Sequence, residues 1–284
     1  MKSSLAKTFS EEGILAFDCP FLQGILNKWN RLLDPYFEGL KDQSIAAIPI
    51  TQLDHLGIFD EFMDSPVLGL IREIMPDAII TSFEAQEIKA NQEKSHVRGD
   101  ILEGWHLDID PELDITEKPH YVSIFIYLTD VSPTGGGFEI MPGKVTPHLA
   151  NGTSCIKMHG TKGTSFVWNR RLFHRGSPNH DSIRRRSLKI EFQNNFLENQ
   201  VVRSPEVKNL LSAIANRPGV KNKDFKEFFL GSKHQGTHKR FELPETESHD
   251  LNVRSIKTNS RIKVSSSKNF YNKIIRRVNL ILHR

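Results

Sequence analysis

Cysteine is scarce in this chain of 284 residues, which has only Cys19 and Cys155. Two thiols so far apart in sequence provide neither a disulfide framework nor the paired spacing of a zinc-binding motif. We therefore expect both to be buried thiols in a protein of a reducing compartment.

The chain also lacks a long apolar run, because no stretch approaches the roughly 20 residues that a membrane-spanning helix needs. The first residues, Met1 to Lys7, do not contain the apolar segment of a signal peptide. These absences predict a cytoplasmic protein.

Acidic residues become rare toward the end of the chain. Residues 1–200 contain 20 lysines and arginines against 27 acidic residues, whereas residues 201–284 contain 18 against 7. The net charge of +4 therefore comes from the C-terminal part. It does not indicate nucleic-acid binding by the chain as a whole.

Two stretches before residue 76 have the three-four apolar spacing of helices. In the first, between residues 8 and 42, the apolar face runs from Phe21 to Leu33, and Asp34-Pro35 is predicted to end the helix. The second covers residues 53–75, and Pro66 is predicted to split it.

From Ala78 onward the pattern changes to short apolar segments separated by glycine and proline turns, which is typical of strands. The predicted strands are 78–89, 104–109, 121–128, 138–141, 163–168, 172–174 and 187–192. Such spacing favours a mainly β fold with flanking α-helices, built on a cupin-like jelly roll or double-stranded β-helix. We place the jelly-roll core at about residues 78–200, within a domain of residues 1–230, and a further helix at 204–215.

His106 and Asp108 are the first candidate metal ligands. Alternate residues of a strand point to the same side, so these two side chains would project together while Leu107 packs behind them. His174, on a distant strand, would complete a set of two histidines and one carboxylate, the set that non-haem iron oxygenases use. A His-x-Asp pair alone is weak, because the chain contains 12 histidines.

With these elements placed, residues 8–200 resemble the phytanoyl-CoA dioxygenase family of Fe(II)/2-oxoglutarate oxygenases. Five motifs in order carry the resemblance: Trp105-His106-Leu107-Asp108, Tyr127-Leu128-Thr129-Asp130, the turn and strand from Gly135 to Pro142-Gly143, the stretch Gly163 to His174, and Asn179 with Arg185 after it. The family usually continues Pro-Gly with Ser-His, whereas Lys144-Val145 follow here. This departure predicts different substrate contacts in that loop.

The resemblance implies Fe(II), O₂ and 2-oxoglutarate as cofactors and cosubstrates. One carboxylate of 2-oxoglutarate would chelate the iron with the keto oxygen, and an arginine would bind the other through a planar pair of hydrogen bonds. Spacing favours Arg185, with its neighbours Arg184 and Arg186 as alternatives. Other candidate contacts to 2-oxoglutarate are Tyr121, Ser123 and either Lys89 or Gln86.

The implied reaction is hydroxylation of an unactivated C–H bond in a small or lipid-linked substrate, with release of succinate and CO₂. Asp108 favours hydroxylation, because related halogenases have glycine or alanine at this position. Two alternatives remain open. One is a non-catalytic jelly-roll protein that retains the site to bind a ligand, and the other is a zinc hydrolase.

The C-terminal region has its own pattern. Residues 231–268 are polar and predicted to be a linker, and 269–284 to form a basic amphipathic helix. Residues 251–284 contain nine basic residues and no acidic one. This helix could lie on an anionic membrane surface as a peripheral contact, or pack on the barrel or a partner. We predict no nucleic-acid partner, since the catalytic part has no basic face with interspersed aromatics.

Overall fold

A computed structural model describes residues 4–95, 102–108, 121–141, 155–194, 205–216 and 253–254. Its framework is a seven-stranded antiparallel sheet in the order β10-β1-β7-β4-β9-β3-β2. The strands of this large sheet are β1 (Ile14–Phe17), β2 (Ile45–Pro49), β3 (Ala78–Ile88), β4 (Tyr121–Tyr127), β7 (Ser165–Asn169), β9 (Arg185–Asn194) and β10 (Val253–Arg254).

A smaller antiparallel sheet in the order β6-β5-β8 faces the large one. It consists of β5 (Phe138–Ile140), β6 (Ile156–Met158) and β8 (His174–Gly176). An isolated bridge between His106 and His174 adds one more residue pair at the β8 edge. Together the two sheets form the jelly-roll core predicted from the sequence.

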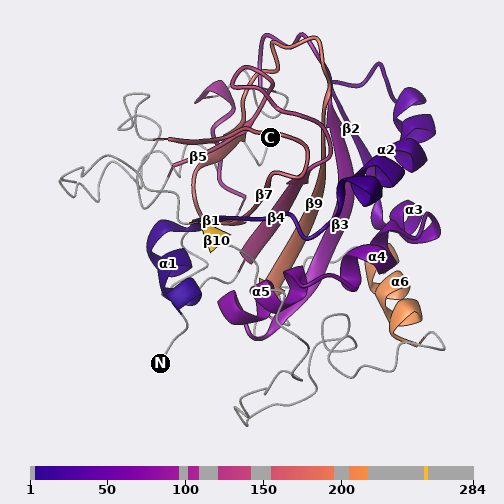
Figure 1. Cartoon of the computed structure of the whole chain (residues 1–284), viewed down its shortest axis with the longest axis vertical. Coiled ribbons are helices and arrows are strands. Elements are labelled where there is room, and N and C mark those ends of the chain that lie inside the picture. Colours follow the sequence, from indigo (N-terminus) through magenta and orange to yellow (C-terminus); the bar gives the residue numbers. More distant parts are fainter. Residues whose placement is uncertain are drawn as a thin grey trace.

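Helices cover the outer face of the large sheet, and Figure 1 shows α2, α3, α4 and α6 along its β2–β3 side. The described helices are α1 (Ser4–Glu12), α2 (Gln23–Glu38), α3 (Ile50–His55), α4 (Ile58–Met63), α5 (Val67–Ile74), the 3-10 helix η1 (Leu102–Gly104) and α6 (Pro205–Ala215). Helices α2 to α6 overlap the stretches predicted to be helical, whereas α1 was not predicted. Pro66 separates α4 from α5 as expected, and a further break occurs at Gly57.

The prediction that Asp34-Pro35 ends the first helix was wrong, because α2 continues to Glu38 with Pro35 inside it. Proline costs a helix one backbone hydrogen bond. Tertiary contacts offset that cost here: Phe37 is buried, and Asp34 pairs with Arg186 at 2.8 Å.

Strand alternation divides the large sheet between two cores. On β4, Val122, Ile124 and Ile126 pack into the core under the helices, where Trp29 and Leu33 of α2 are also fully buried. Phe125 and Tyr127 point the other way, into the core between the two sheets. Burying one large apolar side chain contributes roughly 1.5–3 kcal/mol, so both layers stabilise the fold.

Several strands differ from their predicted ranges. The predicted strand 104–109 is reduced to the single bridge at His106, and β8 begins at His174 rather than ending there. Strands β1, β2 and β6 were not predicted. Within the predicted linker 231–268, Val253 and Arg254 pair with β1. The rest of that stretch and the predicted helix 269–284 lie outside the described residues.

Candidate metal centre

His106, Asp108 and His174 meet at one end of the barrel. Each offers a ligand atom, and these atoms all lie within 4.8 Å of one another. Asp108 Oδ1 is 3.7 Å from Nε2 of His106 and 3.6 Å from Nε2 of His174. Atoms bound to one metal at roughly 2.0–2.2 Å can lie up to about 4 Å apart, so this spacing leaves room for a shared ion.

The backbone explains how residues so distant in sequence come together. His106 and His174 exchange two backbone hydrogen bonds of 3.1 Å, which fixes them side by side. The chain turns sharply just before His106, where Glu103 and Gly104 have φ values of +53° and +87°. Only glycine adopts such angles freely, so the turn depends on Gly104.

Both histidines are oriented through their other ring nitrogen. Nδ1 of His106 lies 2.7 Å from the carbonyl oxygen of Gly104, and Nδ1 of His174 lies 2.9 Å from that of Leu172. A carbonyl can only accept, so each Nδ1 donates its proton. Each Nε2 then presents a lone pair toward Asp108, as a metal ligand must. The ring of Trp168 packs 4.2 Å from that of His174 and holds it from the side.

The second oxygen of Asp108 is bound by Arg170, a residue that the sequence reasoning missed. Arg170 Nε donates to Asp108 Oδ2 at 2.9 Å, and Arg170 Nη1 donates to Glu191 Oε2 at 2.8 Å. Burial raises the pKa of Asp108, but its neighbours His174, Arg170 and Lys189 bring that pKa well below its ordinary value. Asp108 is therefore ionised, as a carboxylate ligand must be.

The ion pairs continue along the inner face of β9. Lys189 Nζ lies 2.7 Å from Glu191 Oε1 and 3.8 Å from Glu84 Oε1 on β3. Burial alone would lower the pKa of Lys189, but the carboxylates of Glu191 and Glu84 raise it. Lys189 lies on the same face of β9 as Arg185, and nothing in the sequence indicated its carboxylate partners.

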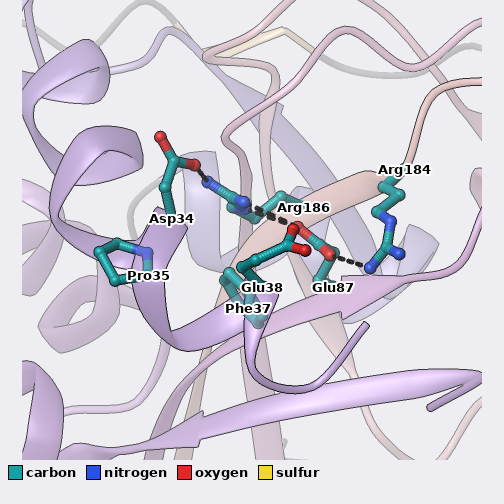
Figure 2. Close-up of a pocket in the computed structure, with 7 residues that line it drawn as sticks. All are labelled: Asp34, Pro35, Phe37, Glu38, Glu87, Arg184 and Arg186. Carbon is teal, nitrogen blue, oxygen red and sulfur yellow. Dashed lines mark hydrogen bonds and ion pairs between the residues drawn. The ribbon is translucent and has the colours of Figure 1, made fainter. Parts of the chain in front are cut away.

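The structure separates the three consecutive arginines. Arg184 and Arg186 lie on the outer face of the sheet and share Glu87, each at 2.7–3.0 Å. Figure 2 shows both among the side chains that line a pocket beside α2. The pocket has a volume of about 430 Å³. It lies on the face of the large sheet opposite to Arg185. Because the charges of Arg184 and Arg186 are paired there, neither is available to the barrel interior.

Arg185 points inward and is 3% exposed. Its guanidinium donates to the carbonyl oxygen of Gly136, and no described carboxylate pairs with it. Burial lowers the pKa of Arg185. A buried arginine without an anion is costly, and this cost is offset when an anion binds.

Other buried polar atoms of the same inner face have no hydrogen-bond partner among the described residues. They are Arg185 Nε, Ser187 Oγ, Ser123 Oγ and Trp168 Nε1. Ser123 is paired with Trp168 across β4 and β7, beside His174. Because unpaired buried polar groups are rare in folded proteins, these atoms mark places where a polar ligand fits.

The other residues predicted to contact 2-oxoglutarate lie on or next to strands β4 and β3. Ser123 and Tyr121 lie on β4 as predicted, and the Tyr121 carbonyl accepts from the Arg170 backbone. Gln86 is on the inner face of β3 and donates to Glu84, whereas Lys89 lies beyond the end of β3. Asn179 fixes the turn after β8, because its side-chain amide donates to the Ile183 carbonyl oxygen at 2.9 Å.

No helix among the described residues is long and apolar enough to cross a membrane. No model of a known protein family matches the chain, and no curated protein matches it in sequence.

Solved structures do share the fold. The chain is similar to HygX from Streptomyces hygroscopicus with nickel and 2-oxoglutarate bound, at 14% identity and a TM-score of 0.52, over 69% of this chain and 88% of that one. It is also similar to EctD from S. alaskensis with 2-oxoglutarate and 5-hydroxyectoine, at 14% identity and a TM-score of 0.53, over 68% and 76%. A third is the non-heme alpha ketoglutarate dependent epimerase SnoN, at 13% identity and a TM-score of 0.52, over 67% and 79%.

Proposed function

We propose that this protein is an Fe(II)/2-oxoglutarate-dependent dioxygenase that hydroxylates an unactivated C–H bond. The observation that carries the proposal is a convergent His106–Asp108–His174 set in the same barrel as a buried Arg185 without an anion. The similar structures support it, since two of them contain 2-oxoglutarate.

The three candidate ligands fit a ferrous ion. Two neutral imidazoles and one carboxylate oxygen on one side of a metal form the facial set of non-haem iron oxygenases. Nε2 of His106, Nε2 of His174 and Oδ1 of Asp108 would hold it, because their neighbours already fix the opposite atom of each group. Three protein ligands leave the remaining coordination positions to cosubstrates.

The inner face of the barrel fits 2-oxoglutarate. Arg185 would bind the carboxylate far from the metal, and the unpaired hydroxyl of Ser187, two residues along the same face, would donate to it. Ser123 and Trp168 offer donors beside His174 for the other end. When bound, Fe(II) and 2-oxoglutarate supply the activation of O₂, with release of succinate and CO₂.

We further propose that the enzyme belongs to a phytanoyl-CoA dioxygenase-like branch of these oxygenases. The motifs that resemble this family imply that the substrate is a small or lipid-linked molecule. The carboxylate at Asp108 supports hydroxylation over halogenation. We also propose that the protein is cytoplasmic and contacts a membrane surface peripherally through residues 269–284. Sedimentation of the full chain with anionic vesicles would test this membrane contact directly.

Conversion of 2-oxoglutarate to succinate tests the proposal. Protein supplied with Fe(II), ascorbate and 2-oxoglutarate in air should release succinate above a metal-free control, slowly even without the right substrate. Asp108→Ala and His106→Ala should abolish this release, because each removes a ligand. A wild-type protein that binds iron but never releases succinate would favour the non-catalytic ligand-binding alternative, and preferential zinc binding would favour a hydrolase.

A further inference from the structure

Arg170 lies between two partly buried carboxylates at the edge of the candidate metal centre. Its side chain is 15% exposed, and those of Asp108 and Glu191 are 19% and 13% exposed. Its backbone is fixed directly after β7, where its N–H donates to the carbonyl oxygen of Tyr121 at 3.1 Å. The guanidinium is therefore held from both its backbone and its two acid partners.

The hydrogen bond from Arg170 gives the two oxygens of Asp108 different roles. Oδ2 accepts from Arg170 Nε, while Oδ1 faces the Nε2 atoms of both histidines. Because a carboxylate can bind a metal through one or both oxygens, the contact reserves a single oxygen for the ion. A second bound oxygen would take a coordination position that a chelating cosubstrate needs.

Glu191 keeps this arrangement electrically balanced. A guanidinium so near a dication would otherwise weaken metal binding through like-charge repulsion. Glu191 Oε2 accepts from Arg170 at 2.8 Å, and its Oε1 pairs with Lys189 at 2.7 Å. Positive and negative groups thus alternate from Asp108 to Lys189, and each carboxylate has a fixed orientation.

We propose that Arg170 is a positioning residue that holds Asp108 in single-oxygen coordination, with Glu191 holding Arg170 in turn. This inference rests on the proposed function, since it concerns the same metal. Loss of such a neighbour typically weakens metal affinity about 10–100-fold. It should also weaken 2-oxoglutarate binding to the metal-loaded protein, which a purely structural role would not do.

The experiment measures Ni²⁺ affinity of the full chain by calorimetry, then 2-oxoglutarate affinity of the nickel-loaded protein. Arg170→Gln should raise the Kd for Ni²⁺ about 10–100-fold and also raise the Kd for 2-oxoglutarate. Arg170→Lys should restore part of the affinity for Ni²⁺ and for 2-oxoglutarate. Glu191→Gln should weaken both affinities, but less than Arg170→Gln does.

Arg186→Gln is the matched control. Arg186 is 10% exposed and pairs with the buried Glu87 at 2.7 Å, on the outer face of the sheet. Its loss should lower thermal stability as much as the loss of Arg170 while leaving both affinities within about 2-fold.

Wild-type affinities from Arg170→Gln, or equal losses from Arg186→Gln, would overturn the inference while leaving the proposed function intact. If Arg170→Gln does not fold, the Glu191→Gln and Arg170→Lys results decide in the same way. A wild-type protein that binds no Ni²⁺ would instead contradict the proposed function itself.

Discussion

At the scale of single residues, the candidate metal centre is defined by the hydrogen bonds that already occupy one polar atom of each of its three side chains. Backbone carbonyls occupy Nδ1 of both histidines, and Arg170 occupies one oxygen of Asp108. The atoms left over are the three that converge. Such orientation lowers the entropy cost of metal binding, because the ligands need not reorganise.

Arg185 provides the prediction at this scale. Arg185→Gln should raise the Kd for 2-oxoglutarate at least about 10-fold, because a hydrogen bond to a charged group contributes roughly 1.5–3 kcal/mol. Metal affinity should change little. The stability of the ligand-free protein should not fall, since the variant removes a buried cation with no described anion.

Arg184→Gln is the control for this variant. Arg184 belongs to the same arginine run but pairs with Glu87 on the outer face. Calorimetric titration of the metal-loaded variants with 2-oxoglutarate makes the comparison. A larger loss in Arg184→Gln than in Arg185→Gln would move the cosubstrate contact away from Arg185.

At the scale of elements, the turn before β5 connects the arginine to the fold. The carbonyl of Gly136 accepts from Arg185, and Gly136 has φ of +72°. A Cβ added there would lie 2.8 Å from Cβ of Asn179, the residue that sets the turn after β8. Two turns that connect the large and the small sheet, one between β4 and β5 and the other between β8 and β9, therefore meet where the inner arginine is fixed.

Gly136→Ala should lower the free energy of unfolding by about 2 kcal/mol or more, because it combines a left-handed backbone with a close contact. It should also weaken 2-oxoglutarate binding through displacement of the Arg185 partner. Urea denaturation and ligand titration provide the two measurements.

Gly69→Ala, within α5, serves as the comparison for Gly136→Ala. A Cβ at Gly69 meets nothing within 4 Å, so this change should be neutral or stabilise by roughly 0.5–1 kcal/mol. Equal effects of the two alanines would show that the turn before β5 has no special role.

At the scale of the whole molecule, much of the fold could be predicted because strand alternation and turn residues are local signals. The motif spacing correctly brought His106, Asp108 and His174 together. It could not show that α2 continues through Pro35, since that depends on Phe37 and Asp34 meeting β9. Arg170 was missed for the same reason, because its partners lie 62 and 21 residues away in sequence.

The arginine run illustrates the remaining ambiguity. Alternation shows that Arg185 and its two neighbours face opposite sides of β9, but the sequence does not say which side is the interior. Leu188, Ile190 and Phe192 make one face of β9 more apolar than the other, and the structure buries them under the helices rather than inside the barrel. Only the position of the helices resolves this, and no local pattern encodes it.

The most direct test of the central claim is the absorption spectrum of the anaerobic protein with Fe(II) as 2-oxoglutarate is added. A visible charge-transfer band, which forms when a 2-oxo acid chelates ferrous iron, should appear with the wild type and be absent with His174→Ala. Absence of the band in wild-type protein that has bound Fe(II), or an identical band in His174→Ala, would contradict iron ligation by this triad.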